Sequence, residues 1–134
     1  MLIQERYLGD TWKMMVCCIF LNLTTRTQLE KIVNEFFMRW PDADAFLQAK
    51  KREVIRLIKP LGLYNRRYKN LKGFSEDFSA LSPSNIPKMR GIGRYASDCY
   101  KLMCLNDLSV TPNDHALREY RQRRRLTLAN DSDA

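Results

Sequence analysis

The chain has 134 residues, of which 45% are apolar, and a formal net charge of +8 at pH 7. This length fits one globular domain with its own core, and the positive charge favours an anionic partner, either nucleic acid or an acidic membrane surface. The longest apolar run, residues 14–23, is too short to span a bilayer, and no secretory leader pattern is present. We therefore expect a soluble, intracellular, monomeric protein that does not enter a membrane.

Helical periodicity runs through almost the whole chain. Val and Ile are sparse, alternating apolar and polar residues do not persist, and no Asn-Gly or Asp-Gly hairpin turn occurs. The sequence therefore predicts an all-α fold. The expected helices are residues 2–8, 10–21, 24–40, 42–49, 52–59, 65–78, 94–106 and 112–125. Asp10 is the expected N-cap of the second helix, Thr24 or Thr25 that of the third, and Asp42 or Asp44 that of the fourth.

The four cysteines are read as structural. Neither the adjacent pair nor the later pair has the spacing of a zinc site, and the chain has a single histidine. We predict no metal site and four buried free thiols in a reducing compartment, namely Cys17, Cys18, Cys99 and Cys104.

A Gly-Ile-Gly turn at Gly91–Gly93 is followed at once by the helix that starts at Arg94. Glycine permits positive φ and close backbone approach, and the exposed N–H groups at a helix start can bind phosphate. The bland alternative is a tight turn between two helices that only packs the core. The turn lies among cations, which favours an anionic ligand: Lys88, Arg90, Arg94 and Lys101.

A second basic segment runs from Lys51 to Lys72. It holds eight basic residues and one acid, Glu53, and is either a solvated helix face or an extension of the positive surface at the glycine turn. The eight are Lys51, Arg52, Arg56, Lys59, Arg66, Arg67, Lys69 and Lys72.

The turn MRGIGRYASDCY followed by VTPNDHAL resembles the helix-hairpin-helix (HhH-GPD) DNA glycosylase superfamily, and in particular the thymine/uracil glycosylase domain of methyl-CpG-binding-domain proteins. Three further segments follow in that family's order: Leu2–Glu5, Asp10–Asn22 and Lys59–Tyr64. The resemblance implies a two-lobed helical glycosylase fold over residues 1–120, with the hairpin at about 84–106, and a divergent basic tail at 121–134. It also implies a nuclear protein. No cysteine follows Cys104, so the iron–sulfur cluster of some relatives is not expected.

The resemblance assigns Asp114 as the catalytic carboxylate, where it would stabilise positive charge on the sugar and orient a water molecule. From the pattern alone, Asn113 or Asp114 could instead cap the last helix. Tyr95 stands where strand-nicking relatives carry the lysine that forms a Schiff base, which a phenol cannot form. Tyr95 would then line the base pocket; the alternative is a core aromatic residue.

Two further residues match the family's DNA-reading positions. Gln4 would read the polar edge of a flipped pyrimidine, or else be an exposed residue near the terminus. Leu63 would enter the base stack as an apolar wedge, or else pack in the core. The expected DNA-binding residues are Leu63, Arg90, Gly91, Gly93 and Arg94. No cofactor is expected, although hairpins of this type can hold a monovalent cation through backbone carbonyls.

Two positions depart from the family pattern. Relatives usually have arginine at Leu23, where it fills the gap left by the flipped base, and often a lysine at Ala116. The prediction is a monofunctional DNA glycosylase of base excision repair that removes thymine or uracil mispaired with guanine in duplex DNA. The alternatives are a catalytically impaired helix-hairpin-helix DNA-binding module and, less favoured by the charge, a helical protein-interaction domain.

Overall fold

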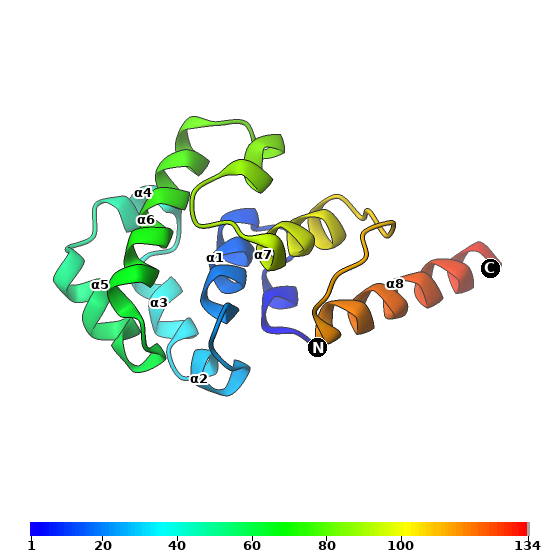
Figure 1. The fold of residues 1–134 in the computed structure, drawn as a ribbon, viewed down its shortest axis with the longest axis horizontal. Coiled ribbons are helices and arrows are strands. Elements are labelled where there is room, and N and C mark those ends of the chain that lie inside the picture. Colours follow the sequence, from blue (N-terminus) through cyan, green and yellow to red (C-terminus); the bar gives the residue numbers. More distant parts are fainter. Residues whose placement is uncertain (134) are drawn as a thin grey trace.

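The computed structural model describes the backbone of residues 1–133 and the side chains of residues 1–130, and every regular element in that range is a helix. Figure 1 shows α1 (Thr11–Leu21) between two groups of helices, with α8 extending away from the body. Within the described range, no helix has the length and apolar character needed to cross a membrane.

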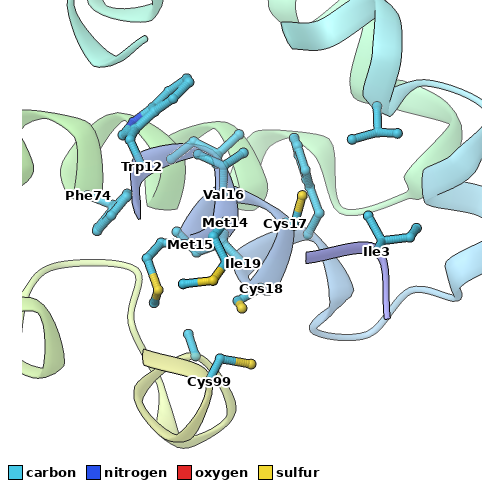
Figure 2. Close-up of a cluster of buried hydrophobic side chains, with 14 of the residues drawn as sticks. Ile3, Trp12, Met14, Met15, Val16, Cys17, Cys18, Ile19, Phe74 and Cys99 are labelled. Carbon is cyan, nitrogen blue, oxygen red and sulfur yellow. The ribbon is translucent and has the colours of Figure 1, made fainter. Parts of the chain in front are cut away.

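The central helix α1 begins where the sequence predicted. The Asp10 side chain accepts a hydrogen bond from the Lys13 N–H at 3.1 Å and so caps the helix. All residues from Met14 to Phe20 are buried, as expected for a helix that is apolar on every side. Figure 2 shows Cys18 of α1 and Cys99 of α7 in one sulfur-rich part of this core. Burial raises the pKa of the Cys17 and Cys18 thiols, which keeps them protonated.

One group of helices packs around an aromatic core. The ring of Phe36 lies edge-on to Phe20 at 5.2 Å and to Trp40 at 5.1 Å between centroids. Asp42 caps the next helix through the Ala45 N–H, as one of the two expected caps. The elements are α2 (Arg26–Glu30), α3 (Val33–Arg39), α4 (Ala43–Leu47), α5 (Lys51–Ile58), η2 (Lys59–Leu61) and α6 (Tyr64–Ala80).

The prediction of one continuous helix over residues 24–40 is wrong. The helix is broken between α2 and α3, because Ile32 takes φ −125° and ψ −15°, outside the helical region. Ile32 is itself buried, so the break serves core packing, and the apolar spacing of a straight helix did not reveal it.

The second group carries the glycine turn. It comprises η1 (Ile3–Tyr7), η3 (Pro83–Lys88), α7 (Arg94–Cys99), η4 (Tyr100–Cys104) and α8 (His115–Asp133). The helix expected at 94–106 is present, but after Cys99 it widens into a π-helical turn, in which the Leu105 N–H bonds the Tyr100 carbonyl.

Helix α8 continues without a break through the expected domain boundary at residue 120. Three arginines of the basic run contact the protein rather than only solvent. Arg121 donates to the Val110 carbonyl at 2.9 Å, and Arg125 donates to the Leu108 carbonyl at 3.0 Å. Arg123 pairs with Glu5 at 3.1 Å. These contacts tie the first half of α8 to the body of the domain.

Candidate active site

A pocket of about 580 Å³ opens where four segments meet: η1, the loop after α1, α7 and the start of α8. Gln4, Tyr95 and Asp114, which lie up to 110 positions apart in the chain, all line it. The structure therefore brings together the three residues that the sequence assigned to the catalytic and base-binding roles. Leu23, Arg94 and Ala116 also line this pocket.

Asp114 is placed on the pocket wall by the start of α8. Its Oδ2 accepts the Leu117 N–H at 2.9 Å, so the capping role weighed from the sequence is real. The cap holds the carboxylate in one orientation, facing the positive end of the helix dipole, and the side chain remains half-buried in the pocket. One residue thus caps the helix and presents a fixed anion to whatever occupies the pocket.

Gln4 is fully buried, so it is not the exposed terminal residue that the sequence left open. Its Nε2 donates to the Tyr95 hydroxyl at 2.9 Å and to the Cys99 sulfur at 3.6 Å. Its Oε1 is buried and has no hydrogen-bond partner among the residues that the structure describes. A buried acceptor without a partner costs about 1–3 kcal/mol.

Tyr95 lines the pocket together with Asp114 and contacts Gln4 through its hydroxyl. Burial raises the pKa of its phenol, and nearby Cys99, Cys18 and Asp114 raise it further. The hydroxyl is therefore neutral at physiological pH, and it accepts the hydrogen bond from Gln4. The side chain is half-buried, lines the pocket and packs against the core, so both interpretations of Tyr95 describe part of its surroundings.

The wedge candidate Leu63 is 52% exposed, which rules out core packing. Its backbone is left-handed, with φ 49° and ψ 37°, at the N-cap of α6. Leu23 is similar, with φ 63° and 69% of its surface exposed. A leucine in this backbone region costs about 1–2 kcal/mol, so each loop exposes an apolar side chain and carries strain.

The glycine turn packs against α6. Gly91 has φ +82°, and a Cβ atom there would lie 2.6 Å from the Asn70 carbonyl oxygen, so only glycine fits. Gly93 is exposed and forms the N-cap of α7, and a Cβ there would meet open space. Its side of the turn is therefore open to a ligand.

The two arginines at the turn differ in their partners. Arg90 donates to Asp77 from its side chain at 2.8 Å and from its backbone N–H at 2.9 Å, and it lies 3.7 Å from Glu76. These bonds fasten the turn to α6. Arg94 is more open: it donates to the Thr111 carbonyl at 3.3 Å, lies 3.7 Å from Asp98 and lines the pocket.

No cluster of three or more His, Cys, Asp or Glu residues that could hold a metal ion occurs in the described range. The monovalent cation expected at the turn would need backbone carbonyls rather than such side chains, and it stays a prediction.

The prediction that the basic segment is exposed is wrong at Arg67. Seven of the eight cations between Lys51 and Lys72 are exposed, but Arg67 is only 4% exposed and points inward. Its guanidinium donates to five backbone carbonyls at 2.8–3.3 Å: Phe20, Asn22, Leu23, Leu61 and Gly62. A signal was available, because residues 67, 71 and 74 share one face of α6 and Leu71 and Phe74 are buried.

Comparison with known proteins defines the class. The family model described as "HhH-GPD superfamily base excision DNA repair protein" matches residues 16–132, and the chain belongs to this family. A solved structure titled "structure of a thermostable thymine-DNA glycosylase" superposes with a TM-score of 0.67 at 25% identity, over 75% of this chain and 50% of that one. The predicted all-helical family fold is thereby confirmed.

Two individual relatives are similar to this chain over most of its length. The chain is 34% identical over 120 residues to a methyl-CpG-binding domain protein 4-like protein of Arabidopsis thaliana, covering 89% of this chain and 27% of the relative. It is 31% identical to a thymine-DNA glycosylase of Aeropyrum pernix, covering 74% of this chain and 48% of the relative. The chain therefore spans less than half the length of either curated relative.

Proposed function

We propose that this chain is a DNA glycosylase that hydrolyses the N-glycosidic bond of thymine or uracil mispaired with guanine. The observation that carries the proposal is the convergence of Asp114, Gln4 and Tyr95 on one pocket beside the glycine turn. Support comes from the family match and from relatives named for thymine or for thymine and uracil.

The glycine turn and α7 would hold the DNA backbone. The open side of Gly93 and the N–H groups that follow it suit a phosphate, and exposed Arg94 adds positive charge beside them. A nucleotide rotated out of the duplex would then enter the pocket that Arg94 also lines.

Gln4 supplies a chemical reason for the choice of base. Its unpaired Oε1 is an acceptor that lacks a donor, and thymine and uracil both carry an N3–H group. The N3 atom of cytosine has no hydrogen and would face this oxygen as a second acceptor. An imide base therefore satisfies the buried amide, whereas cytosine leaves its oxygen unpaired or repelled at that position.

Asp114 would perform the hydrolytic step. As the bond between C1′ and the base nitrogen lengthens, positive charge grows on the sugar, and the fixed carboxylate stabilises it. Water adds to C1′ with loss of a proton, the bonding pair leaves with the base, and the base takes up a proton. Tyr95 offers no amine for a Schiff base, so the strand is left intact with an abasic site.

The competing function is a DNA-binding module without turnover. It is favoured by the residues at two pocket positions, Leu23 and Ala116, where the resemblance predicts arginine and lysine. The assay that separates the two uses duplexes with a single G·T or G·U pair. Strand breaks that appear only after alkali support the glycosylase, and salt-sensitive binding without breaks supports the module.

A further inference from the structure

Two exposed, strained leucines lie on neighbouring loops that share one buried partner. Leu23 follows α1 and Leu63 precedes α6, yet the carbonyls of Leu23 and of Gly62 both accept hydrogen bonds from the Arg67 guanidinium, at 3.1 and 2.8 Å. The two loops are therefore within reach of a single side-chain group. Both leucines have positive φ and expose about half or more of their surface.

A buried cation loses its hydration, so it needs hydrogen-bond partners inside the protein to offset that cost. The hydrogen bonds of the Arg67 side chain run to carbonyls at the end of α1 and in the loops at residues 22–23 and 61–62. Carbonyl oxygens satisfy the planar guanidinium in several directions at once, which a lysine ammonium cannot reproduce. Desolvation lowers the pKa of Arg67, which is the direction expected for a buried cation.

Strained backbone persists only where its surroundings over-determine it. At Leu63 and Leu23 the exposed side chains contribute little packing, so the restraint must come from the backbone side. We infer that Arg67 is a positioning residue that holds the two loops as one unit, so that Leu23 and Leu63 form a two-pronged apolar wedge against the DNA base stack. The inference rests on the proposed function, because the wedge serves to extrude the target nucleotide.

The wedge has a chemical consequence at Leu23. An apolar prong can fill the space left by a flipped base, but it cannot hydrogen-bond the base that remains opposite. Separation of the strands therefore depends on the shape and rigidity of both prongs, and rigidity is what the Arg67 guanidinium provides. Without it the loops can relax toward negative φ, and the leucines lose their fixed positions.

The test compares Arg67→Lys with Arg66→Lys, the same change at the exposed neighbouring residue. Each is assayed on uracil in a G·U duplex and on uracil in a single strand, which needs no wedge. We expect Arg67→Lys to lose tenfold or more in kcat/KM on the duplex and less than twofold on the single strand, with Arg66→Lys unchanged on both. An equal loss on both substrates, or no loss on the duplex, would overturn the inference.

A binding readout separates failure of this inference from failure of the proposed function. With 2-aminopurine placed beside the target base, unstacking raises its fluorescence whether or not a bond is cleaved. Wild-type protein should raise the emission and Arg67→Lys should raise it by less than a third as much at saturation. A wild-type protein that releases no base but gives this difference supports the wedge and rejects the glycosylase.

If circular dichroism shows that Arg67→Lys does not fold, variants that keep the Arg67 guanidinium still test whether the two leucines act together. Leu23→Ala, Leu63→Ala and the double variant are compared on the same two substrates. If the two prongs act as one unit, the kcat/KM of the double variant on the duplex should be no more than threefold below that of the worse single variant. On the single strand the variants should match wild type. Independent, multiplicative losses would show two separate wedges and overturn the shared unit.

Discussion

The glycine turn and the leucine loops both require left-handed backbone, but they meet the requirement in opposite ways. At Gly91 the side chain is absent because α6 lies too close for a Cβ atom. At Leu23 and Leu63 a large side chain is retained in the same backbone region, although nothing in the core needs it. The difference teaches that the positive φ at Gly91 serves packing without strain, whereas the strain at the two leucines supports no packing in the core.

The largest stability effect is expected from Gly91→Ala. The new Cβ atom would meet the Asn70 carbonyl oxygen at 2.6 Å in a backbone region that alanine avoids. We expect a loss of about 2–4 kcal/mol in the free energy of unfolding, measured by urea denaturation. Gly93→Ala is the matched control, because its Cβ faces open space, and it should cost less than about 1 kcal/mol. Equal costs at the two glycines would contradict the packing explanation.

Leu63→Gly should separate stability from function. Glycine adopts φ 49° without strain, so we expect the free energy of unfolding to be unchanged or higher by up to about 1 kcal/mol. Activity on a mismatched duplex should fall by roughly tenfold, because the apolar prong is gone. Thermal melting and initial rates measured on the same preparation check this. A variant that loses both stability and activity would show that Leu63 packs the fold after all.

The smallest expected effect is a pH dependence of stability, caused by the hydrogen bonds between Arg90 in the glycine turn and Asp77 in α6. The Arg90 guanidinium and backbone N–H lower the pKa of Asp77. A carboxylate with a lowered pKa in the folded state adds stability above its unfolded pKa, and this stability is lost as pH falls through the folded value. Because solvent reaches and screens this pair, its contribution to stability is small. Melting of the wild type and Asp77→Asn should therefore differ at pH 7, and the difference should disappear only at a pH below the ordinary pKa of an aspartate.

The sequence predicted much of this arrangement where the deciding contacts are local. The Asp10 and Asp42 caps depend on residues three positions away, and both are found. Gln4, Tyr95 and Asp114 came from resemblance to a family, and the fold brings them to one pocket. That resemblance identified positions, but it did not indicate that the Gln4 oxygen lies buried and unpaired.

The misses share a physical cause, which is dependence on distant backbone. The hydrogen-bond partners of Arg67 lie up to 47 positions away and cannot be read from its neighbours in the sequence. Those neighbours are rich in lysine and arginine, which suggested an exposed face. The break at Ile32 depends on how two short helices fit around the aromatic core, which apolar spacing does not encode. The positive φ of Leu23 and Leu63 had no signal in the residue type, because leucine rarely adopts this backbone region.

The most direct test of the central claim is single-turnover release of uracil from a G·U duplex by wild type, Asp114→Asn and the control Glu119→Gln, which makes the same change of charge at an exposed residue of α8. The amide can still accept the Leu117 N–H, so the cap and the fold should survive while the negative charge at the sugar is lost. We expect Asp114→Asn to be slower than wild type by at least a thousandfold with DNA affinity within threefold, and Glu119→Gln to match wild type. Release by Asp114→Asn at the wild-type rate would contradict the account.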